Sequence, residues 1–343
     1  MARIEGQCVC DRFASVTEAA ALAAAEWVGR GDGLAGDLAA REAMAAQLAR
    51  LPFRARVVAA RGGHQASSAL RVGDEVGIDS GPRPDNSIGD RGEGDECPLW
   101  ELAVDPLEGH APLARGSDGA LAMLAVGPPG SIMAVPEMYM QKMIVAGEAA
   151  AAIDIDAPVV ENIRAVAAAL GRRPQDLSVV VLDRARHEDL IAQVKRSGAR
   201  LRLIEDGDAS AGIAAAVRDA WVDMYIGIGG STEGIITAAA LRCLGGEIQA
   251  RFWPVSRHQV EQVRATGVED IEARLTTSDM AGEGVLFAAT AVTGGRFLRG
   301  IDVRSDGART ETLVLCSRCH GVRVVKTIHR SQNGGPQVSL ETR

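Results

Sequence analysis

The chain has 343 residues, of which 47% are hydrophobic, and this suits a globular protein of about two domains, not a disordered or fibrous one. Its 37 Lys and Arg residues against 45 Asp and Glu residues give a net charge of −8. That balance argues against a nucleic-acid partner, because binding a phosphate backbone requires a basic surface.

No stretch of the sequence predicts a membrane segment or an exported protein. Apolar runs such as 19–25 are far shorter than the roughly 20 residues that span a bilayer. The first residues lack the apolar stretch after a basic start that is typical of signal peptides, and six cysteines are too few for a disulfide scaffold. We therefore expect a protein of the reducing cytoplasm.

The N-terminal part of the chain predicts two helices and a strand. The first helix, 15–29, has Ser15 as a suitable N-cap, Glu18 three residues later, and Gly29 as its end. A second helix is expected over 37–51 and a strand over 56–60. Residues 73–97 are rich in Gly, Asp and Pro and have no apolar period, which predicts an inserted surface loop at 73–98.

The rest of the chain predicts a helix-covered sheet. Strand patterns at 120–126 and 131–136, joined by a turn, favour an antiparallel meander next to a strand at 99–105. Helices then alternate with strands, which predicts a parallel or mixed sheet. The alternating segments are helices 159–170, 187–197, 209–220 and 232–244 and strands 177–182, 200–204 and 222–228. Strand patterns return over 284–329.

We therefore predict an α/β fold of layered, alternating sheets and helices. It divides into an N-terminal half, 1–156, which carries the inserted loop at 73–98, and a C-terminal half, 157–343. Polar strand ends in the second half are expected to bind ligand.

Two carboxylates follow a buried strand in the segment WELAVDPLEG. Asp105 ends the strand and Glu108 comes three residues later, so both lie at the edge of the predicted sheet. Hard oxygen ligands of this kind suit Mg²⁺ or Mn²⁺. A strand end with a plain Asp-Pro turn is the alternative.

A glycine-rich turn joins a strand to a helix in YIGIGGSTEG. Backbone amides at such a helix start can receive a phosphate, and Glu233 in the first turn could complete a metal site. The spacing does not match the dinucleotide-binding fingerprint.

Two further strand ends are polar. Arg184 and Arg186 follow one strand, and Asp206 and Asp208 follow the next. Ligands of open α/β sheets bind beyond the carboxyl ends of the strands, where arginines suit a phosphate and aspartates suit sugar hydroxyls. Solvated charges at helix starts are the alternative.

The segment CSRCH carries a C-x-x-C pair, Cys316 and Cys319. A single pair lacks the second pair of a structural zinc site, so we interpret it as a strand-to-strand turn that carries thiols. Zinc or redox use is the alternative, here as for Cys8 and Cys10.

Taken together, the segments AVDPLEG, PEMYMQKMIV, RARHEDLI, EDGDAS and IGIGGSTEG resemble the class II fructose-1,6-bisphosphatases, members of the lithium-sensitive sugar-phosphate phosphatase superfamily. The resemblance covers nearly the whole chain outside the inserted loop. It implies a layered α/β fold and metal-assisted attack of water on a phosphate monoester. It also implies Mg²⁺ or Mn²⁺, a phosphorylated sugar such as fructose 1,6-bisphosphate, and a homodimer or homotetramer.

The resemblance also assigns roles to individual residues. The metal ligands map onto Asp32, Asp105, Glu108 and Glu233, and the residues expected in catalysis are Asp32, Asp105, Glu108 and His110. The substrate-binding positions map onto Glu108, Gly109, Tyr139, Arg184, Arg186, Asp206, Gly207, Asp208 and Gly230.

Four positions depart from the family pattern. A metal-binding glutamate is Arg61 here, and its fixed positive charge cannot ligate a cation and repels one nearby. An acidic residue that helps to activate water is Gln65, and a metal-binding threonine is His110. The lysine expected after the Arg-Gly-Asp turn is Gly33. The changes concentrate on activation of water.

Three functions remain open on the sequence. The first is a sugar-phosphate phosphatase, diverged in substrate or weak on fructose 1,6-bisphosphate, in which His64 or His110 substitutes as base or ligand. The second is an inactive paralogue that binds sugar phosphate as a regulatory or partner subunit. The third is a structural subunit, which the retained substrate-binding residues argue against. We expect a strongly reduced or absent rate on fructose 1,6-bisphosphate.

Overall fold

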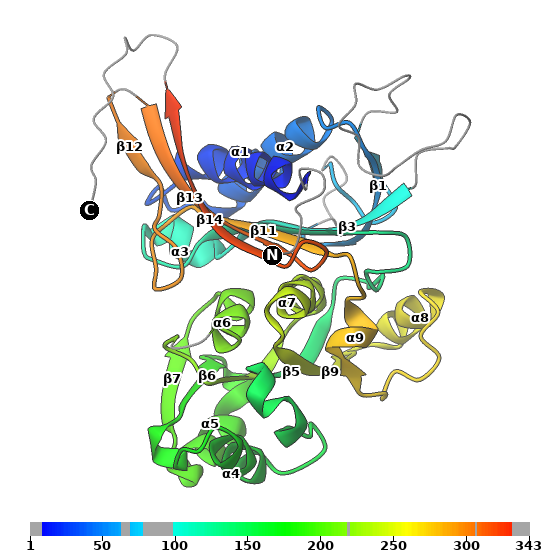
Figure 1. Cartoon of the computed structure of the whole chain (residues 1–343), viewed down its shortest axis with the longest axis vertical. Helices are drawn as coiled ribbons and strands as arrows, with labels where there is room; N and C mark the ends of the chain where they lie inside the picture. The colour runs from blue at the N-terminus through cyan, green and yellow to red at the C-terminus, as the bar shows by residue number, and fades with distance from the viewer. Residues whose placement is uncertain (1–8, 63–68, 78–98, 218–219, 306, 331–343) are drawn as a thin grey trace, which may run out of the picture.

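Two β-sheets alternate with layers of helices in this computed structural model, which describes residues 9–62, 69–77, 99–217, 220–305 and 307–330. Helices α1 and α2 cover the outer face of the first sheet, α6 and α7 lie between the sheets, and α4 and α5 cover the outer face of the second sheet (Figure 1). The predicted α/β class with layered sheets and helices is thus confirmed. Most of the predicted loop at 73–98 lies outside the described residues.

The first sheet has the strand order β12-β13-β11-β4-β3-β1-β2, with β14 paired to β13. Its strands are β1 (Arg54–Ala60), β2 (Glu75–Val76), β3 (Leu99–Glu108), β4 (Leu121–Gly127), β11 (Leu286–Ala291), β12 (Asp302–Arg304), β13 (Gly307–Cys316) and β14 (Gly321–Arg330). The second sheet has the order β10-β9-β5-β8-β6-β7. Its strands are β5 (Tyr139–Val145), β6 (Ser178–Leu182), β7 (Arg200–Ile204), β8 (Met224–Gly230), β9 (Glu247–Trp253) and β10 (Leu275–Thr276).

The helices agree only in part with the sequence signals. The first helix has Phe13 instead of Ser15 at its N-cap and ends at Ala25, before Gly29. The second helix begins at Gly33 behind the N-cap Asp32, four residues earlier than predicted. The α-helices are α1 (Ala14–Ala25), α2 (Gly33–Leu48), α3 (His110–Arg115), α4 (Val159–Ala169), α5 (Glu188–Ser197), α6 (Asp208–Ala215), α7 (Ser231–Leu244), α8 (Arg257–Ala265) and α9 (Thr277–Met280). The 3-10 helices are η1 (Val9–Phe13), η2 (Gly147–Ala152), η3 (Pro174–Asp176) and η4 (Ala185–His187). In α5, acidic residues stand in the first turn, basic residues in the last, and Gly198 ends the helix at a φ of 84°.

Helix α7 is the central element of the core. Its residues from Ser231 to Leu241 are all buried, because one side packs on the first sheet and the other on the second. A helix buried on every side needs no polar face, which explains the run Ala238–Ala240. Small side chains allow the two sheets to approach α7 closely.

The predicted alternation of helices and strands is confirmed in the second sheet, where β6 pairs in parallel with both β7 and β8. The predicted strand at 131–136 is wrong. Only Ile132 forms a β-bridge there, to Ala281, and the Glu101 carboxylate accepts the N–H bonds of Gly130 and Ile132. Backbone bonds from Met133 to Met280 and from Val135 to Val58 also hold the segment, but no continuous ladder forms. Strand β4 instead pairs with β3 and β11.

The predicted division at residue 156 does not follow the sheets. Strand β5 precedes that boundary but belongs to the second sheet, and β11 to β14 follow it but belong to the first. After the second sheet the chain returns to the first sheet, where β11 pairs antiparallel with β4 over Leu286–Ala291. The first sheet is thus built from both ends of the chain.

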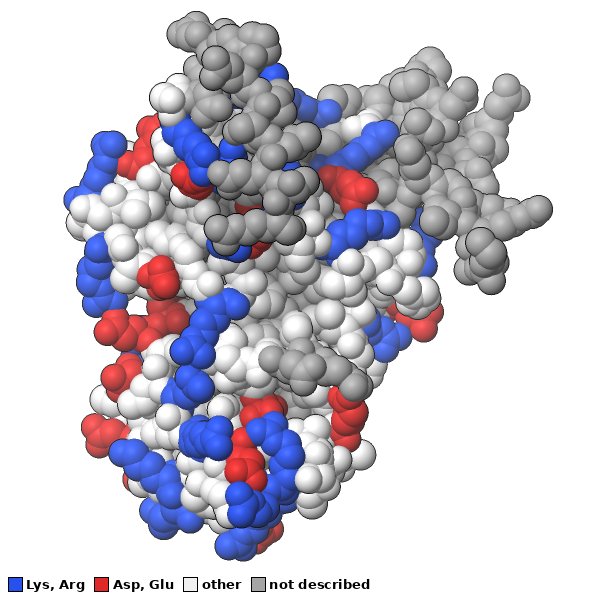
Figure 2. All heavy atoms as spheres, turned by 60° about the vertical axis from the view of Figure 1, so that its left-hand side comes forward, with Lys and Arg blue, Asp and Glu red and all other residues white. Residues whose placement is uncertain are grey.

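Within the described residues, no helix combines the length and apolar character needed to cross a membrane. Figure 2 shows Lys and Arg side chains interspersed with Asp and Glu over one face of the molecule.

Candidate active site

Strand β3 brings Asp105 and Glu108 to one end of the first sheet, and both side chains are fully buried. Residues three apart in a regular strand point to opposite faces. Here the pairing with β4 shifts between Asp105, opposite Met123, and Glu108, opposite Leu121. This irregularity at Pro106 and Leu107 adds one residue to β3 and allows both carboxylates to reach the same site.

The N-termini of α6 and α7 close the site from the second sheet. The N–H of Ala209, in the first turn of α6, donates to Oε1 of Glu108 over 2.9 Å. Glu233 lies in the first turn of α7, and its carboxylate folds back over Gly230, where a Cβ would lie 1.9 Å from Oε2. A side chain at position 230 would therefore displace Glu233.

Arg61 extends from the end of β1 into this acidic cluster. Its Nη1 lies 3.1 Å from Oε1 of Glu233 and 3.8 Å from Oδ2 of Asp105. The backbone holds it in place, because its N–H donates to the carbonyl of Val104 and its own carbonyl accepts a bond from Arg41. Arg61 is thus a permanent cation between two carboxylates.

Burial governs the ionisation of these acids. It raises the pKa of Asp105 well above the ordinary value, while Arg61 opposes the rise. Burial also raises the pKa of Glu108, to which Asp208 and Asp105 add repulsion, and burial raises the pKa of Glu233 against the pull of Arg61. Burial by itself lowers the pKa of Arg61, but Glu233 and Asp105 raise it by more. A cluster of this kind is stabilised by positive charge.

The donor set fits one divalent cation between Asp105 and Glu108. Both oxygens of Asp105 and Oε2 of Glu108 are buried and accept no hydrogen bond from the described residues. Carboxylate oxygens are the ligands that Mg²⁺ and Mn²⁺ prefer. The side between Asp105 and Glu233 does not fit a second cation, because the Arg61 guanidinium lies there.

Asp32, predicted as a ligand, lies at the surface and caps α2, with Oδ1 accepting the N–H of Ala35 over 2.9 Å. The sequence interpretation missed Asp37, one turn further along α2. Asp37 is buried, pairs with Arg41 at 3.1 Å, and lies 3.4 Å from Nε2 of His110. Burial raises the pKa of Asp37, but His110 and Arg41 lower it by more.

Gly33 and His110, two of the departures from the family pattern, lie next to each other. A Cβ on Gly33 would lie 2.4 Å from the carbonyl oxygen of His110, so a lysine cannot occupy position 33 beside this backbone. His64 and Gln65 lie outside the described residues.

The sequence interpretation also missed Lys142, a fully buried lysine on β5. Its Nζ donates to Oδ2 of Asp208 over 2.5 Å and to the carbonyl of Gly230 over 2.9 Å. A Cβ on Gly229 would lie 1.9 Å from the same Asp208 oxygen, which explains that glycine. A single lysine within the apolar segment MYMQKMIV is the signal that would have identified it.

The predicted substrate residues lie at the open side of the second sheet. Arg186 donates to the carbonyl of Ile228 over 2.8 Å, and its guanidinium lies 4.8 Å from the ring centre of Tyr139. Tyr139 is 41% exposed, and Arg184 is also exposed, so both can meet a ligand. Asp206 accepts the N–H of Gly207 over 3.0 Å. Gly109 caps α3 at a φ of 89°, a conformation that favours glycine.

His187 joins two strand ends beneath Arg186. Its buried ring contacts the carbonyl of Leu182 through Nδ1 and accepts the N–H of Ile228 through Nε2, both over 2.8 Å. Accepting that bond requires a neutral ring with its proton on Nδ1. Burial lowers the pKa of His187, and the positive charges of Arg186 and Arg184 lower it further.

We expect His187→Phe to reduce the free energy of unfolding by about 1–3 kcal/mol at pH 8, because both hydrogen bonds are lost. The deficit should shrink below pH 6.5, where the unfolded natural chain takes up a proton that the folded ring resists. Urea unfolding at pH 8 and pH 5 measures both values. His258→Phe, at an exposed position of α8, is the control, and a deficit of equal size at both pH values would contradict a neutral ring.

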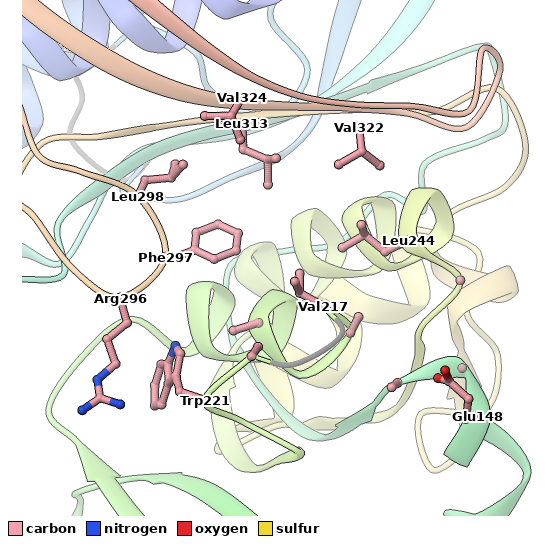
Figure 3. Close-up of a pocket in the computed structure, with 16 residues that line it drawn as sticks. Glu148, Val217, Trp221, Leu244, Arg296, Phe297, Leu298, Leu313, Val322 and Val324 are labelled. Carbon is pink, nitrogen blue, oxygen red and sulfur yellow. The ribbon is translucent and has the colours of Figure 1, made fainter. Parts of the chain in front are cut away.

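Two pockets flank the inter-sheet helices. One of about 1030 Å³ has Phe297, Leu298 and Leu313 on one side and Leu244 opposite, with Arg296 beside Trp221 at one end (Figure 3). None of the predicted site residues lines it within the described chain. Asp206 and Gly207 instead line a second pocket of about 680 Å³, together with Arg115, Arg202 and Arg296.

Comparisons with known proteins identify the family of this chain. The family described as "Bacterial fructose-1,6-bisphosphatase, glpX-encoded" matches residues 8–329. A "D-fructose 1,6-bisphosphatase class 2/sedoheptulose 1,7-bisphosphatase" of Synechococcus sp. (strain JA-3-3Ab) is 40% identical over 96% of this chain and 97% of its own length. A protein of the same name from Trichodesmium erythraeum (strain IMS101) is 35% identical over 92% of this chain and 94% of its own. The chain belongs to the bacterial, class 2 fructose-1,6-bisphosphatase family.

Proposed function

We propose that the chain is a sugar-phosphate phosphatase that hydrolyses a phosphate monoester with one divalent cation and one fixed cation, Arg61. The observation that carries the proposal is the buried pair Asp105 and Glu108, whose orphaned oxygens lie beside the guanidinium of Arg61. Members of the family use divalent metal ions, and the relatives named above are sugar bisphosphatases.

Mg²⁺ or Mn²⁺ would be held by Asp105 and Glu108. The resemblance also implies Asp32 and Glu233 as ligands, but here Asp32 caps α2 and Glu233 contacts Arg61, so we assign the cation to the first pair. A bound cation of this kind lowers the pKa of water and neutralises charge on a phosphate. Arg61 supplies a second positive charge next to the same carboxylates, and a guanidinium also suits phosphate oxygens. The chain thus keeps positive charge at a position where the family places a metal ligand.

The substrate-binding residues divide by chemistry. Arg184, Arg186 and Tyr139 suit a phosphate at the open side of the second sheet. Asp206, Asp208 and the backbone at Gly207 suit sugar hydroxyls, in line with the pocket that Asp206 lines. Arginines also line that pocket and suit a second phosphate, which favours a sugar bisphosphate. Gly109, Gly230 and Glu108 complete the predicted contacts.

His110 is proposed as the group that accepts a proton from the attacking water. Asp37 lies 3.4 Å from its Nε2 and orients the ring, as a carboxylate does in other base dyads. We retain the expectation of a low rate on fructose 1,6-bisphosphate, because Arg61 replaces a ligand. A location in the cytoplasm and a homodimer or homotetramer are also part of the proposal.

Phosphate release from a panel of sugar mono- and bisphosphates, with Mg²⁺ or Mn²⁺, tests the function. We expect release from at least one substrate, and a lower rate on fructose 1,6-bisphosphate than on the best member of the panel. If no substrate yields phosphate above the rate of Asp105→Asn, the proposal fails and an inactive sugar-phosphate-binding protein remains.

We expect His110→Gln and Asp37→Asn each to reduce kcat on the best substrate by about 10- to 100-fold. Because the two residues act as one unit, the double variant should lose no more than the worse single variant. Steady-state kinetics of the natural chain, the two single variants and the double variant gives a double-mutant cycle, and the exposed His258→Gln is the control. Losses that multiply in the double variant would contradict the dyad.

A further inference from the structure

Three cysteines from opposite ends of the chain meet on the first sheet, away from the carboxylates. Cys10 lies in η1, Cys316 ends β13, and Cys319 lies in the turn before β14. Their Sγ atoms all lie within 4.8 Å of one another. Cys10 and Cys316 are buried, while Cys319 is exposed. The predicted strand-to-strand turn of the C-x-x-C pair is confirmed, and the fold adds a third thiol to it.

The spacing of the thiols matches a metal site better than a disulfide. The sulfurs of Cys10 and Cys319 lie 4.0 Å apart, whereas a disulfide bond measures about 2.05 Å. Zinc–sulfur bonds of about 2.3 Å in tetrahedral geometry separate neighbouring sulfurs by roughly 3.8 Å. The observed distance of 4.0 Å between the two sulfurs is close to the sulfur–sulfur distance in such a zinc site.

The turn is shaped to present both of its thiols to Cys10. Cys316 pairs with Gly321 at the end of the hairpin, and His320 takes a φ of 51°, which is unfavourable for a residue with a Cβ. A Cβ on Gly321 would lie 3.1 Å from Sγ of Cys319. A left-handed residue followed by a glycine thus forms the turn that carries Cys319 back toward Cys316, and the Sγ atoms of both lie within 4.8 Å of that of Cys10.

Arg323 provides the charge that thiolates need. Its Nη1 donates to Sγ of Cys10 over 2.9 Å and lies 3.4 Å from Oδ1 of Asp11. A guanidinium beside a thiol favours the thiolate, which is the form that binds metal. Three thiolates and Zn²⁺ carry a net charge of −1, and Arg323 offsets it.

We propose that Cys10, Cys316 and Cys319 bind one Zn²⁺ in a structural site, with a water or another side chain as the fourth ligand. Binding replaces the three thiol protons, which pass to solvent, and involves no oxidation. The ion joins η1 to the β13–β14 hairpin and so ties both ends of the chain to the first sheet.

The zinc content of the full-length natural protein tests the site. The protein is purified with zinc and then dialysed against EDTA to remove ions held by carboxylates. We expect close to one zinc per chain in the natural protein and in Cys243→Ser, whose thiol contacts the carbonyl of Val285 instead. Cys316→Ser and Cys319→Ser should each retain no more than about a tenth of the zinc found in the natural protein. Circular dichroism checks folding, and the exposed Cys319 makes its serine variant the less disruptive of the two.

Cobalt provides a second measurement on the same proteins. Co²⁺ added to the zinc-free natural chain should give the near-ultraviolet charge-transfer bands of thiolate ligands and the visible bands of a tetrahedral ion, and Cys319→Ser should not. Absence of these bands and of zinc in the natural protein would overturn the site. So would a mass lower by the two hydrogens lost in forming a disulfide, or full zinc content in Cys319→Ser.

Discussion

Arg61→Glu is expected to increase Mn²⁺-dependent phosphate release from fructose 1,6-bisphosphate, and the triple variant with Gln65→Asp and His110→Thr should exceed the natural chain by about tenfold or more. The substitution removes a guanidinium that contacts Asp105 and Glu233 and adds a carboxylate in its place. The freed oxygens can then take part in binding a second cation. Initial rates of phosphate release with saturating Mn²⁺ measure the effect.

Arg56→Glu is the matched control for Arg61→Glu. It makes the same change of charge on β1, the strand that leads to Arg61, but Arg56 is exposed and pairs with Glu75 at the surface. We expect its rate to equal that of the natural chain. A single variant Arg61→Glu that is no faster than the natural chain on fructose 1,6-bisphosphate would contradict the role given to Arg61.

Asp105→Asn is expected to reduce the rate on the best substrate by about a thousandfold or more, because it removes a charge that both the divalent cation and Arg61 require. The same substitution should stabilise the metal-free protein at pH 7, since burial makes a charged Asp105 costly there. Asparagine keeps the shape of the neutral acid. Activity and stability thus change in opposite directions.

The sign of the pH dependence follows from the raised pKa of Asp105. The folded state holds the proton more tightly than the unfolded state, whose value is near 3.8, so this contribution to stability is complete below that pH and is lost as the pH rises. The advantage of Asp105→Asn should therefore vanish as the pH falls toward 4. Urea unfolding of metal-free protein between pH 4 and pH 8 measures it, with the exposed Asp302→Asn as control. Equal stability of natural and variant chains at pH 7 would contradict it.

Local signals in the sequence predicted three of the six strands of the second sheet, β6, β7 and β8, but not β5, β9 or β10. They did not predict which strands pair in the first sheet. Helix caps and apolar periods are local, so the alternation from β6 to α7 could be inferred from them. The pairing of β11 with β4 joins segments more than 150 residues apart, and no local pattern encodes such a choice. The strand predicted at 131–136 does not form a ladder, because its N–H groups go to scattered acceptors: Ile132 donates to the Glu101 carboxylate, Met133 to the carbonyl of Met280 and Val135 to the carbonyl of Val58.

Resemblance identified the acidic cluster and the substitution at position 61, but not what the arginine contacts. Arg61 reaches Glu233 because α7 packs against the first sheet next to β1. Asp37 was missed because its segment predicts only a helix, and Lys142 because no strand was predicted over 139–145. The three thiols were assigned separately, since about 300 residues separate Cys10 from Cys316 and only the fold joins them.

Counting the Mn²⁺ ions bound at the active site tests the central claim most directly. EDTA-treated natural protein and Arg61→Glu would be titrated with Mn²⁺, with free ion measured by electron paramagnetic resonance and no substrate present. We predict one bound Mn²⁺ per chain in the natural protein and at least two in Arg61→Glu. The same number in both proteins would contradict the account, because the guanidinium of Arg61 would then not occupy the position of a cation.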